Sequence, residues 1–239
     1  FLQLSRTITG PMGQIGGNIN SVVLALAGAR RIFEFLEVEP EDYSGDVEKV
    51  LKNIDGKEKY FWHDLKTDKY RELLGDIRFK DVDFSYDGKN KVLKNLNLYA
   101  KPGQKVAFVG ATGAGKTTIT NLINRFYDID NGEITFDGID IKRIKKKDLR
   151  SSLGMVLQDT HLFTGTIAEN INYSVDDLDM DKTIEVAKRT NAHDFIKNLE
   201  DGYDTLISGA GGELSEGQMQ LLSIARAEIF NPPVMILDE

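Results

Sequence analysis

The alternation of apolar and polar positions divides the chain into three parts, of which the first is residues 1–36. This part carries few charges, and its longest apolar stretch, residues 22–29, is much shorter than the ~20 residues of a membrane-spanning helix. Small residues are dense in it, and Arg30 and Arg31 follow, as they would at the cytoplasmic end of a closely packed membrane helix. The pattern alone leaves two interpretations open: the end of a membrane domain, or an ordinary amphipathic helix.

The second part, residues 37–75, is polar and of mixed charge. We interpret it as a linker that holds at most short helices. The neighbouring aromatic residues Tyr60, Phe61 and Trp62 could dock on another surface, but loosely packed linker aromatics are the simpler interpretation. We therefore assign this part no function.

The third part, residues 76–239, has the pattern of an α/β domain. Apolar residues alternate with one slip, which predicts a strand with a β-bulge, at Ile77, Phe79, Val82, Phe84 and Tyr86. Leu96 and Leu98 indicate a second strand, and residues 101–103 a turn. The short apolar run at 106–109 is typical of a strand in the middle of a covered parallel sheet. Residues 153–157 and 234–237 are also predicted to be strands, the second of them buried.

A glycine-rich loop directly follows the first of these runs. Residues 110–117 fit the pattern G-x-x-x-x-G-K-[ST], between the strand at 106–109 and a helix predicted over about 116–126. Glycines let backbone N–H groups surround phosphate oxygens, and the positive end of the helix dipole favours the same anion. The residues expected to bind a nucleotide here are Gly110, Thr112, Gly113, Ala114, Gly115, Lys116, Thr117 and Thr118.

Two of these residues have more specific expected roles. Lys116 should reach the β- and γ-phosphates, and the Thr117 hydroxyl is a hard oxygen ligand suited to Mg²⁺. The motif predicts a nucleoside triphosphate site, but it does not distinguish ATPases from GTPases or kinases.

The amino-acid composition argues against some classes of partner and of binding site. The net charge of −8 provides no basic stripe, which argues against nucleic acid as the main partner. The absence of cysteine excludes disulfides and thiolate metal sites. The chain starts at Phe1 and ends directly after an apolar strand, at Asp238 and Glu239, so we expect a fragment that continues at both ends.

A second motif near the end of the chain identifies a family. Leu214, Ser215, Glu216, Gly217 and Gln218 precede Ala-Arg-Ala at 225–227 and an apolar strand that ends in Asp-Glu. This segment resembles the ABC ATPases, whose Leu-Ser-Gly-Gly-Gln signature heads a helix shortly before the Walker B strand. Glu216 replaces the first glycine of the signature, which should keep the phosphate contact and add a negative charge.

The resemblance implies that this signature closes over nucleotide held by the phosphate loop of a second subunit. Ser215 and the N–H of Gly217 lie at a predicted helix N-terminus, which is an anion site, and Gln218 completes the motif. The same residues would also suit an ordinary N-capped helix.

The resemblance also assigns roles to four residues outside the two motifs. Tyr86 stands where the family's aromatic residue stacks on adenine. Gln158 matches the glutamine that contacts Mg²⁺ and the attacking water, and Asp238 should hold Mg²⁺ through water. Glu239 is the expected general base. The implied catalytic residues are thus Glu239, Gln158 and Lys116, and the implied metal residues are Thr117, Gln158 and Asp238.

Further segments resemble the exporter branch of the family, of the multidrug and lipid exporter kind. Residues 164–171 contain the exporters' Thr-Ile-x-Glu-Asn-Ile, and residues 202–205 and 209–212 resemble the segment that touches the coupling helices. Residues 29–36 resemble the junction between the last membrane helix and the ATPase domain. This likeness favours the membrane interpretation of residues 1–36.

The resemblance therefore implies a P-loop NTPase (RecA-like) core with an antiparallel β subdomain and an α-helical signature subdomain, preceded by a helix from the transmembrane domain. Residues 1–36 would end that domain, residues 37–75 would be the linker, and residues 76–239 would be the nucleotide-binding domain, truncated after Walker B. The linker is rather long for the family, and the switch histidine and D-loop would lie beyond residue 239.

The implied function is ATP binding and hydrolysis that drives export of a substrate across a membrane. The implied cofactors are ATP and Mg²⁺, and the partner is a second half-transporter, identical or related. The nucleotide-binding domain would lie on the cytoplasmic side of a plasma or inner membrane. A soluble ABC ATPase and a separate importer subunit are the alternatives; the exporter-like segments and the 75 residues before the domain argue against both.

Overall fold

The structure is a computed structural model that describes residues 2–173, 178–208 and 214–238. It divides into two compact units, Phe1–Asp42 and Tyr43–Glu239, and each is described by itself.

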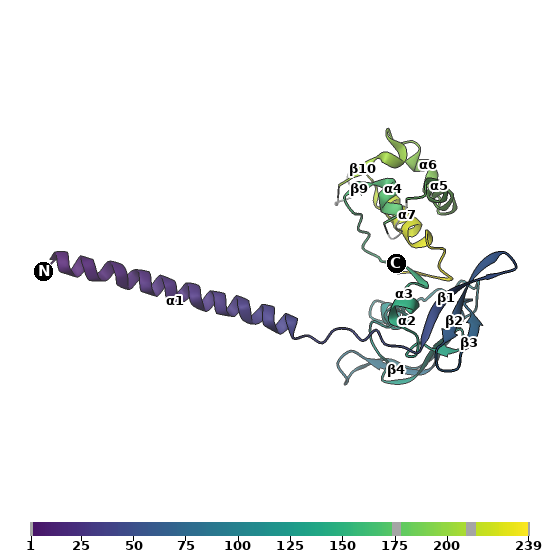
Figure 1. Cartoon of the computed structure of the whole chain (residues 1–239), viewed down its shortest axis with the longest axis horizontal. Coiled ribbons are helices and arrows are strands. Elements are labelled where there is room, and N and C mark those ends of the chain that lie inside the picture. The colour runs from purple at the N-terminus through teal and green to yellow at the C-terminus, as the bar shows by residue number, and fades with distance from the viewer. Residues whose placement is uncertain (1, 174–177, 209–213, 239) are drawn as a thin grey trace. The chain divides into compact units, whose positions relative to one another are not determined.

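The first unit is a single long helix, α1 (Leu2–Leu36), shown in purple in Figure 1. Near its end, the Arg30 Nε donates to the Glu34 carboxylate at 2.7 Å, one helical turn away. From Ile19 onward, the large apolar side chains of this helix are exposed, among them Leu24 and Phe35. Within the described residues, no helix combines the length and the hydropathy that a membrane crossing requires.

The second unit begins with a three-stranded antiparallel sheet in the order β1-β2-β3. Its strands are β1 (Val47–Ile54), β2 (Lys57–Asp64) and β3 (Lys69–Glu72). Asp55 and Gly56 form the two-residue turn between β1 and β2, both with positive φ, as tight hairpins require. The prediction of a linker with short helices is therefore wrong for residues 47–72.

The aromatic cluster of this sheet is not loosely packed. Trp62 is fully buried, its ring meets the Phe136 ring edge-on at 5.4 Å, and its Nε1 donates to the Asp137 carboxylate at 2.9 Å. A large apolar ring with one satisfied polar atom is well suited to a core. The expectation of loose linker aromatics was wrong because the indole has a partner that lies 75 residues further along the chain.

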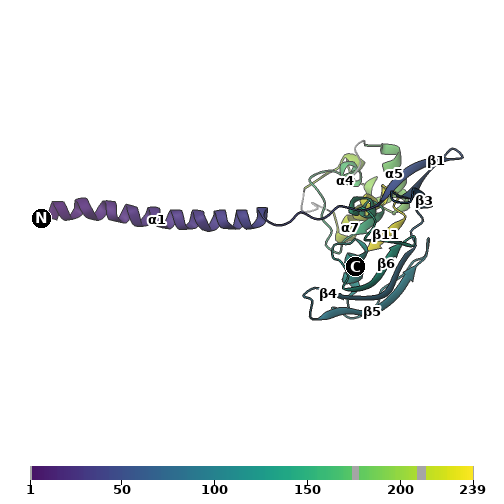
Figure 2. The ribbon, with the colours of Figure 1, turned by 60° about the horizontal axis from the view of Figure 1, so that its bottom comes forward.

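A four-stranded antiparallel sheet packs against this core, in the order β5-β4-β6-β7 (Figure 2). Its strands are β4 (Ile77–Ser85), β5 (Lys91–Ala100), β6 (Asn131–Phe136) and β7 (Ile139–Asp140). The pairing register between β4 and β5 shifts between Phe79 and Val82, which confirms the predicted bulge. The predicted turn is also present, since the Gln104 N–H donates to the Lys101 carbonyl at 2.9 Å.

Regular strands form at two of the three predicted apolar runs, residues 153–157 and 234–237. β8 (Leu153–Val156) and β11 (Val234–Leu237) pair in parallel. Residues 106–109 form no regular strand and pair with no described strand, and Val109 is 96% exposed. Parallel strands depend on hydrogen-bonded neighbours and on cover over both faces, so this apolar run does not become a regular strand here.

The rest of the unit is mainly helical. Near the sheets lie α2 (Lys116–Ile123) and α3 (Lys146–Arg150). A group further along the chain, labelled together in Figure 1, has its own core and consists of α4 (Ile167–Ile171), α5 (Met180–Arg189), α6 (His193–Ile196), a 3₁₀ turn (Gly202–Asp204) and α7 (Glu216–Glu228). The short antiparallel strands β9 (Gly165–Thr166) and β10 (Leu206–Ile207) complete this group.

Candidate functional site

The glycine-rich loop forms as the sequence predicts. Gly113 and Gly115 adopt φ of +84° and +90°, the left-handed region that favours glycine, and α2 begins at Lys116. The Lys116 ammonium donates to the carbonyls of Gly110 at 2.8 Å and Ala111 at 3.0 Å. The helix ends at Ile123, before the predicted end at residue 126. Arg125, two residues later, has a φ of +52°, which is not helical.

The chemistry of this loop fits a polyphosphate. The first N–H groups of a helix have no partners within the helix and point toward its N-terminal end, where an anion is favoured. A side-chain carbon placed at Gly113 would meet no atom within 4 Å, so the loop is open on that side. Lys116 adds a full positive charge, and the loop carbonyls accept hydrogen bonds from it.

The residues expected to hold Mg²⁺ come from three segments. The Thr117 hydroxyl donates to the Asp238 carboxylate at 3.3 Å. The Asp238 N–H donates to the Val156 carbonyl at 3.0 Å, so the end of β11 lies beside the end of β8. Gln158 follows β8 by two residues and is exposed at the same edge. The structure therefore brings Thr117 and Asp238 together, whereas Gln158, two residues beyond the end of β8, makes no hydrogen bond to either among the described residues.

This donor set fits a hard divalent cation. Hydroxyl, carboxylate and amide oxygens are ligands of the kind that Mg²⁺ uses, and Mg²⁺ commonly takes only one or two protein groups, together with substrate phosphates and water. In the part of the chain that the structure describes, no cluster of three His, Cys, Asp or Glu residues could hold a metal by itself. An ion at this edge would be held by few protein groups, with phosphates and water as further ligands.

Tyr86 lies beside the phosphate loop. Its hydroxyl is 3.1 Å from the Thr118 hydroxyl, and its ring meets the Phe84 and Tyr127 rings edge-on at 4.8 Å and 5.0 Å. The side chain is 50% exposed. Tyr86 thus combines a fixed position with ring surface that is free to stack on a planar group. The sequence pattern marked Phe84, but nothing in it indicated Tyr127 as a support of this ring.

The signature segment forms a reciprocal helix cap. The Ser215 hydroxyl accepts from the Gln218 N–H at 3.3 Å, and the Gln218 side-chain oxygen accepts from the Ser215 N–H at 2.8 Å. Gly217 and Glu216 are exposed, and a side-chain carbon at Gly217 would meet no atom within 4 Å. Among the described residues, no hydrogen bond or ion pair joins residues 214–218 to residues 110–118. The two anion-binding helix ends are thus separate within one chain.

Two predicted features lie outside the described residues: the general base at Glu239 and the glycine-rich segment 209–212.

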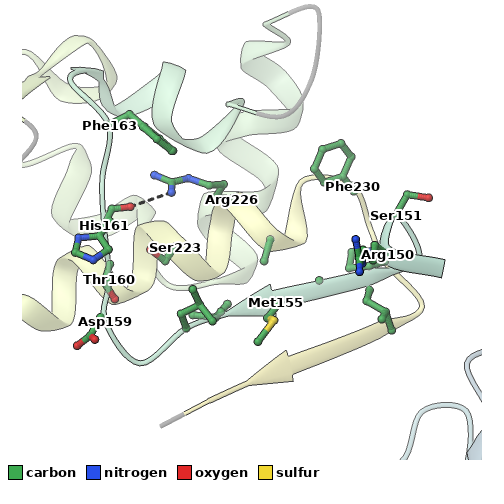
Figure 3. A pocket seen from close by; sticks show the side chains of 16 residues that line it. Arg150, Ser151, Met155, Asp159, Thr160, His161, Phe163, Ser223, Arg226 and Phe230 are labelled. Atoms are coloured by element: carbon green, nitrogen blue, oxygen red, sulfur yellow. Dashed lines mark hydrogen bonds between the residues drawn. The ribbon is translucent and has the colours of Figure 1, made fainter. Parts of the chain in front are cut away.

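A cavity lies away from the phosphate loop. It measures about 430 Å³ and is bounded by β8, α7 and residues 159–163 (Figure 3). Arg226 lines it and makes three hydrogen bonds. Sequence analysis placed this arginine only in the Ala-Arg-Ala motif and gave it no role.

Comparisons with known proteins agree with these observations. The sequence model of the ABC transporter family matches residues 93–239. Over 239 residues, all of this chain, 41% of positions are identical to an uncharacterized ABC transporter ATP-binding protein of Bacillus subtilis (strain 168), of which 36% is covered. A fatty acid ABC transporter ATP-binding/permease protein of Mycobacterium tuberculosis (strain CDC 1551 / Oshkosh) is 41% identical, with 34% of it covered.

A third relative is the ATP-dependent lipid A-core flippase of Syntrophus aciditrophicus (strain SB), 39% identical over all of this chain and 36% of its own length. The chain spans about a third of the length of these relatives. Among solved structures, a bacterial Atm1-family ABC exporter with ATP bound is similar with a TM-score of 0.65 and 41% identity, over 69% of this chain and 29% of that chain.

The family match covers more than half of the chain and includes the phosphate loop, the signature helix and strand β11, which Asp238 follows. The chain therefore belongs to the ABC transporter family and carries its ATP-binding domain, an ATPase with the P-loop NTPase fold.

Proposed function

We propose that the whole protein is an exporter in which two such domains bind ATP between them and use its hydrolysis to move a substrate across a membrane. The observation that carries this proposal is the presence, in one chain, of two helix ends suited to an anion, which no hydrogen bond or ion pair joins among the described residues. One nucleotide can use both ends only if the second belongs to another copy or to a related half-transporter. The open space at Gly217 leaves room for the phosphates of a partner's nucleotide.

Within each site, we propose a division of roles among the residues. The loop N–H groups and Lys116 hold the phosphates, and Tyr86 stacks on adenine. Thr117, Gln158 and Asp238 hold Mg²⁺, which when bound neutralises charge on the phosphate oxygens. Ser215, Gly217 and Gln218 belong to the opposing edge.

Glu239 directly follows Asp238, and we propose that it is the general base that accepts a proton from the attacking water. Its carboxylate would then stand one residue from the group that holds the metal.

The proposed location is a membrane, with the ATP-binding domain on its cytoplasmic side. Residues 1–36 would be the end of the transmembrane domain, where its last helix runs into the ATP-binding domain. Two observations support this. The exporter-like segment forms α4 with a capping box between Thr166 and Glu169. A relative that matches the whole chain is named an ATP-binding/permease protein.

The test compares Glu239→Gln with the parent in the full-length protein reconstituted in lipid. The amide is nearly isosteric but cannot accept a proton, so ATP binding should persist while hydrolysis nearly stops and ATP-bound dimers accumulate. Chelation of Mg²⁺ should stop hydrolysis in the parent. The exposed residue Glu200 provides a matched control, and Glu200→Gln should hydrolyse ATP at the parent rate. Turnover by Glu239→Gln at the parent rate would exclude Glu239 as the base.

A further inference from the structure

The side chain of Arg226 joins two segments that sequence analysis treated separately. Its Nε donates to the Asn170 carbonyl at 3.0 Å, and a terminal nitrogen donates to the Asn170 side-chain oxygen at 2.8 Å. The other terminal nitrogen donates to the His161 carbonyl at 3.0 Å, the bond drawn in Figure 3. His161 comes three residues after Gln158, and Arg226 lies on the helix that begins next to Ser215.

The surroundings of this guanidinium hold it in one orientation. Its centre lies 5.0 Å from the Phe163 ring centroid and 5.8 Å from that of Tyr173, and these two rings stack at 3.9 Å. Asn170 is only 2% exposed, and its amide also bonds the N–H and the carbonyl of Phe163. Burial lowers the pKa of Arg226, but a guanidinium stays protonated in proteins. The link is therefore a charged, planar fork with several simultaneous partners.

The contact between α7 and the sheet is close at one point and open elsewhere. At Gly154 of β8, a side-chain carbon would lie 2.7 Å from Pro232 Cγ and 3.1 Å from the Ala227 carbonyl, so the last turn of α7 lies directly against the strand there. Beside this point, β8, α7 and residues 159–163 line the cavity of about 430 Å³. Residues 159–163 and α7 are thus connected in two ways: Leu162 belongs to the same buried core cluster as Leu222 and Ala225 of α7, and Arg226 adds directed hydrogen bonds to this packing.

We propose that Arg226 is a positioning residue that carries a displacement of the segment after Gln158 to helix α7. Ser215 precedes Arg226 by eleven residues, or ~16 Å of helix, and a helix of this length moves as a rigid rod. A shift of residues 159–163 therefore moves Ser215 and Gly217 relative to the nucleotide of a partner. The inference rests on the proposed function, because it needs both Gln158 and the signature to act on ATP.

A purely structural role would have a different consequence. If Arg226 only stabilised the helical core, its loss would lower the folded fraction, and its effect would be independent of Gln158. If it acts through Gln158, the two residues form one functional unit and their effects on turnover will not multiply.

The experiment is a double-mutant cycle in the full-length protein reconstituted in lipid. Arg226→Gln, Gln158→Ala and the double variant are compared for kcat and KM with MgATP, and for the melting temperature. We expect Arg226→Gln to lower kcat at least tenfold while KM changes less than threefold, and the double variant to be no slower than the slower single variant. Arg226→Lys keeps the charge and part of the bonding, so it should recover part of kcat.

The matched control is Arg189→Gln. Arg189 lies on α5 and pairs with Glu228 of α7, so its loss also removes a charged contact of this helix but leaves residues 159–163 untouched. Arg189→Gln should change kcat only slightly. In a double variant with Gln158→Ala, the fold-changes in kcat of the two substitutions should multiply.

Three results would overturn the proposal: multiplying effects of Arg226→Gln and Gln158→Ala, a kcat per folded site equal to the parent's, or the same non-additivity for Arg189→Gln. Parent turnover is measured first. No turnover in the parent would sink both this inference and the proposed function, whereas parent turnover with independent effects would sink only the role of Arg226.

Discussion

At the residue scale, the nucleotide site is a set of side chains whose positions are fixed by neighbours. Lys116 is held over the loop by two carbonyls, and Thr117 is held against Asp238. Tyr86 is held by the Thr118 hydroxyl and by edge-on contacts with the Phe84 and Tyr127 rings. Each group is thus placed before any nucleotide arrives, which reduces the ordering that binding requires.

For Tyr86, we predict that replacement by Ala weakens ATP binding by roughly 1–3 kcal/mol, by analogy with base–aromatic stacking in nucleic-acid complexes. Tyr86→Phe keeps the ring and loses only the bond to Thr118, so it should bind nearly as well as the parent. Isothermal titration calorimetry under conditions without turnover measures the ATP affinity of both variants. Tyr99→Ala removes another exposed tyrosine and serves as the control. Equal affinity of Tyr86→Ala and the parent would remove Tyr86 from the site.

For Asp64, we predict a stability effect with a defined pH range. The hydrogen bond from Arg143 and those from the N–H groups of Thr67 and Lys66 hold its pKa at about 2, against 3.8 ordinarily, although burial acts in the opposite direction. Because the folded pKa is the lower one, the ionised carboxylate stabilises the fold above pH 4, and this contribution is lost as the pH falls toward 2.

Asp64→Asn should therefore melt at a lower temperature than the parent near neutral pH, and the difference should shrink between pH 4 and pH 2. Melting curves across this range measure it, with the exposed Asp201→Asn as a control that changes little. A difference that is constant with pH would exclude the ionised pair with Arg143 as its cause.

At the element scale, the least expected feature is the β1–β3 sheet. It is attached to the rest of the unit by Trp62, by Arg143 with Asp46 and Asp64, and by Lys49, whose ammonium donates to the Ser151 carbonyl at 2.9 Å. Some of these contacts are made to residues 143–151, which precede β8, the strand that leads to Gln158. The sheet is therefore an integral part of the domain that carries the nucleotide site.

We predict that Trp62→Ala destabilises this chain by about 3–5 kcal/mol, the usual effect of removing a large buried ring. Trp62→Phe keeps most of the apolar contact and loses the bond to Asp137, so its effect should be smaller. Urea unfolding followed by circular dichroism measures both.

Since Trp62 is the one tryptophan in the sequence, acrylamide quenching of the parent reports its burial directly and should be weak. Strong quenching, or a loss below about 1 kcal/mol in Trp62→Ala, would contradict the packing.

The sequence predicted the elements whose signals are local. The bulged strand β4, the turn after β5, and strands β8 and β11 have clear alternation or apolar runs, and the phosphate loop and signature are motifs of fixed spacing. The β1–β3 sheet was missed because most of its residues are polar on both faces, although Asp55-Gly56 is a hairpin signal. The run at 106–109 was expected to be a strand. Whether such a run pairs in a parallel sheet depends on neighbouring strands, which its own residues do not determine.

The long-range contacts of the site could not be predicted from the sequence either. The bond of Tyr86 to Thr118 and those of Arg226 to His161 and Asn170 join residues that are 32 to 65 positions apart. No periodicity reports such pairs, so the sequence could identify Tyr86 only by resemblance and gave no role to Arg226.

At the scale of the whole molecule, the central claim is that one ATP site is built from two chains. The phosphate loop and the signature helix each offer an anion site, and they do not contact each other in the described chain. Gly217→Asp would place a carboxylate at the open signature edge without a clash within its own chain. Lys116→Ala removes the charge of the loop instead. Each change should abolish turnover when both copies carry it.

The most direct measurement co-expresses one full-length copy carrying Gly217→Asp with one carrying Lys116→Ala, each with a different tag, and assays dimers purified on both tags. In such a dimer, one composite site holds both defects and the other is intact. The account predicts that ATP hydrolysis returns to a substantial part of the parent rate. Verified mixed dimers that remain as inactive as each variant alone would contradict it.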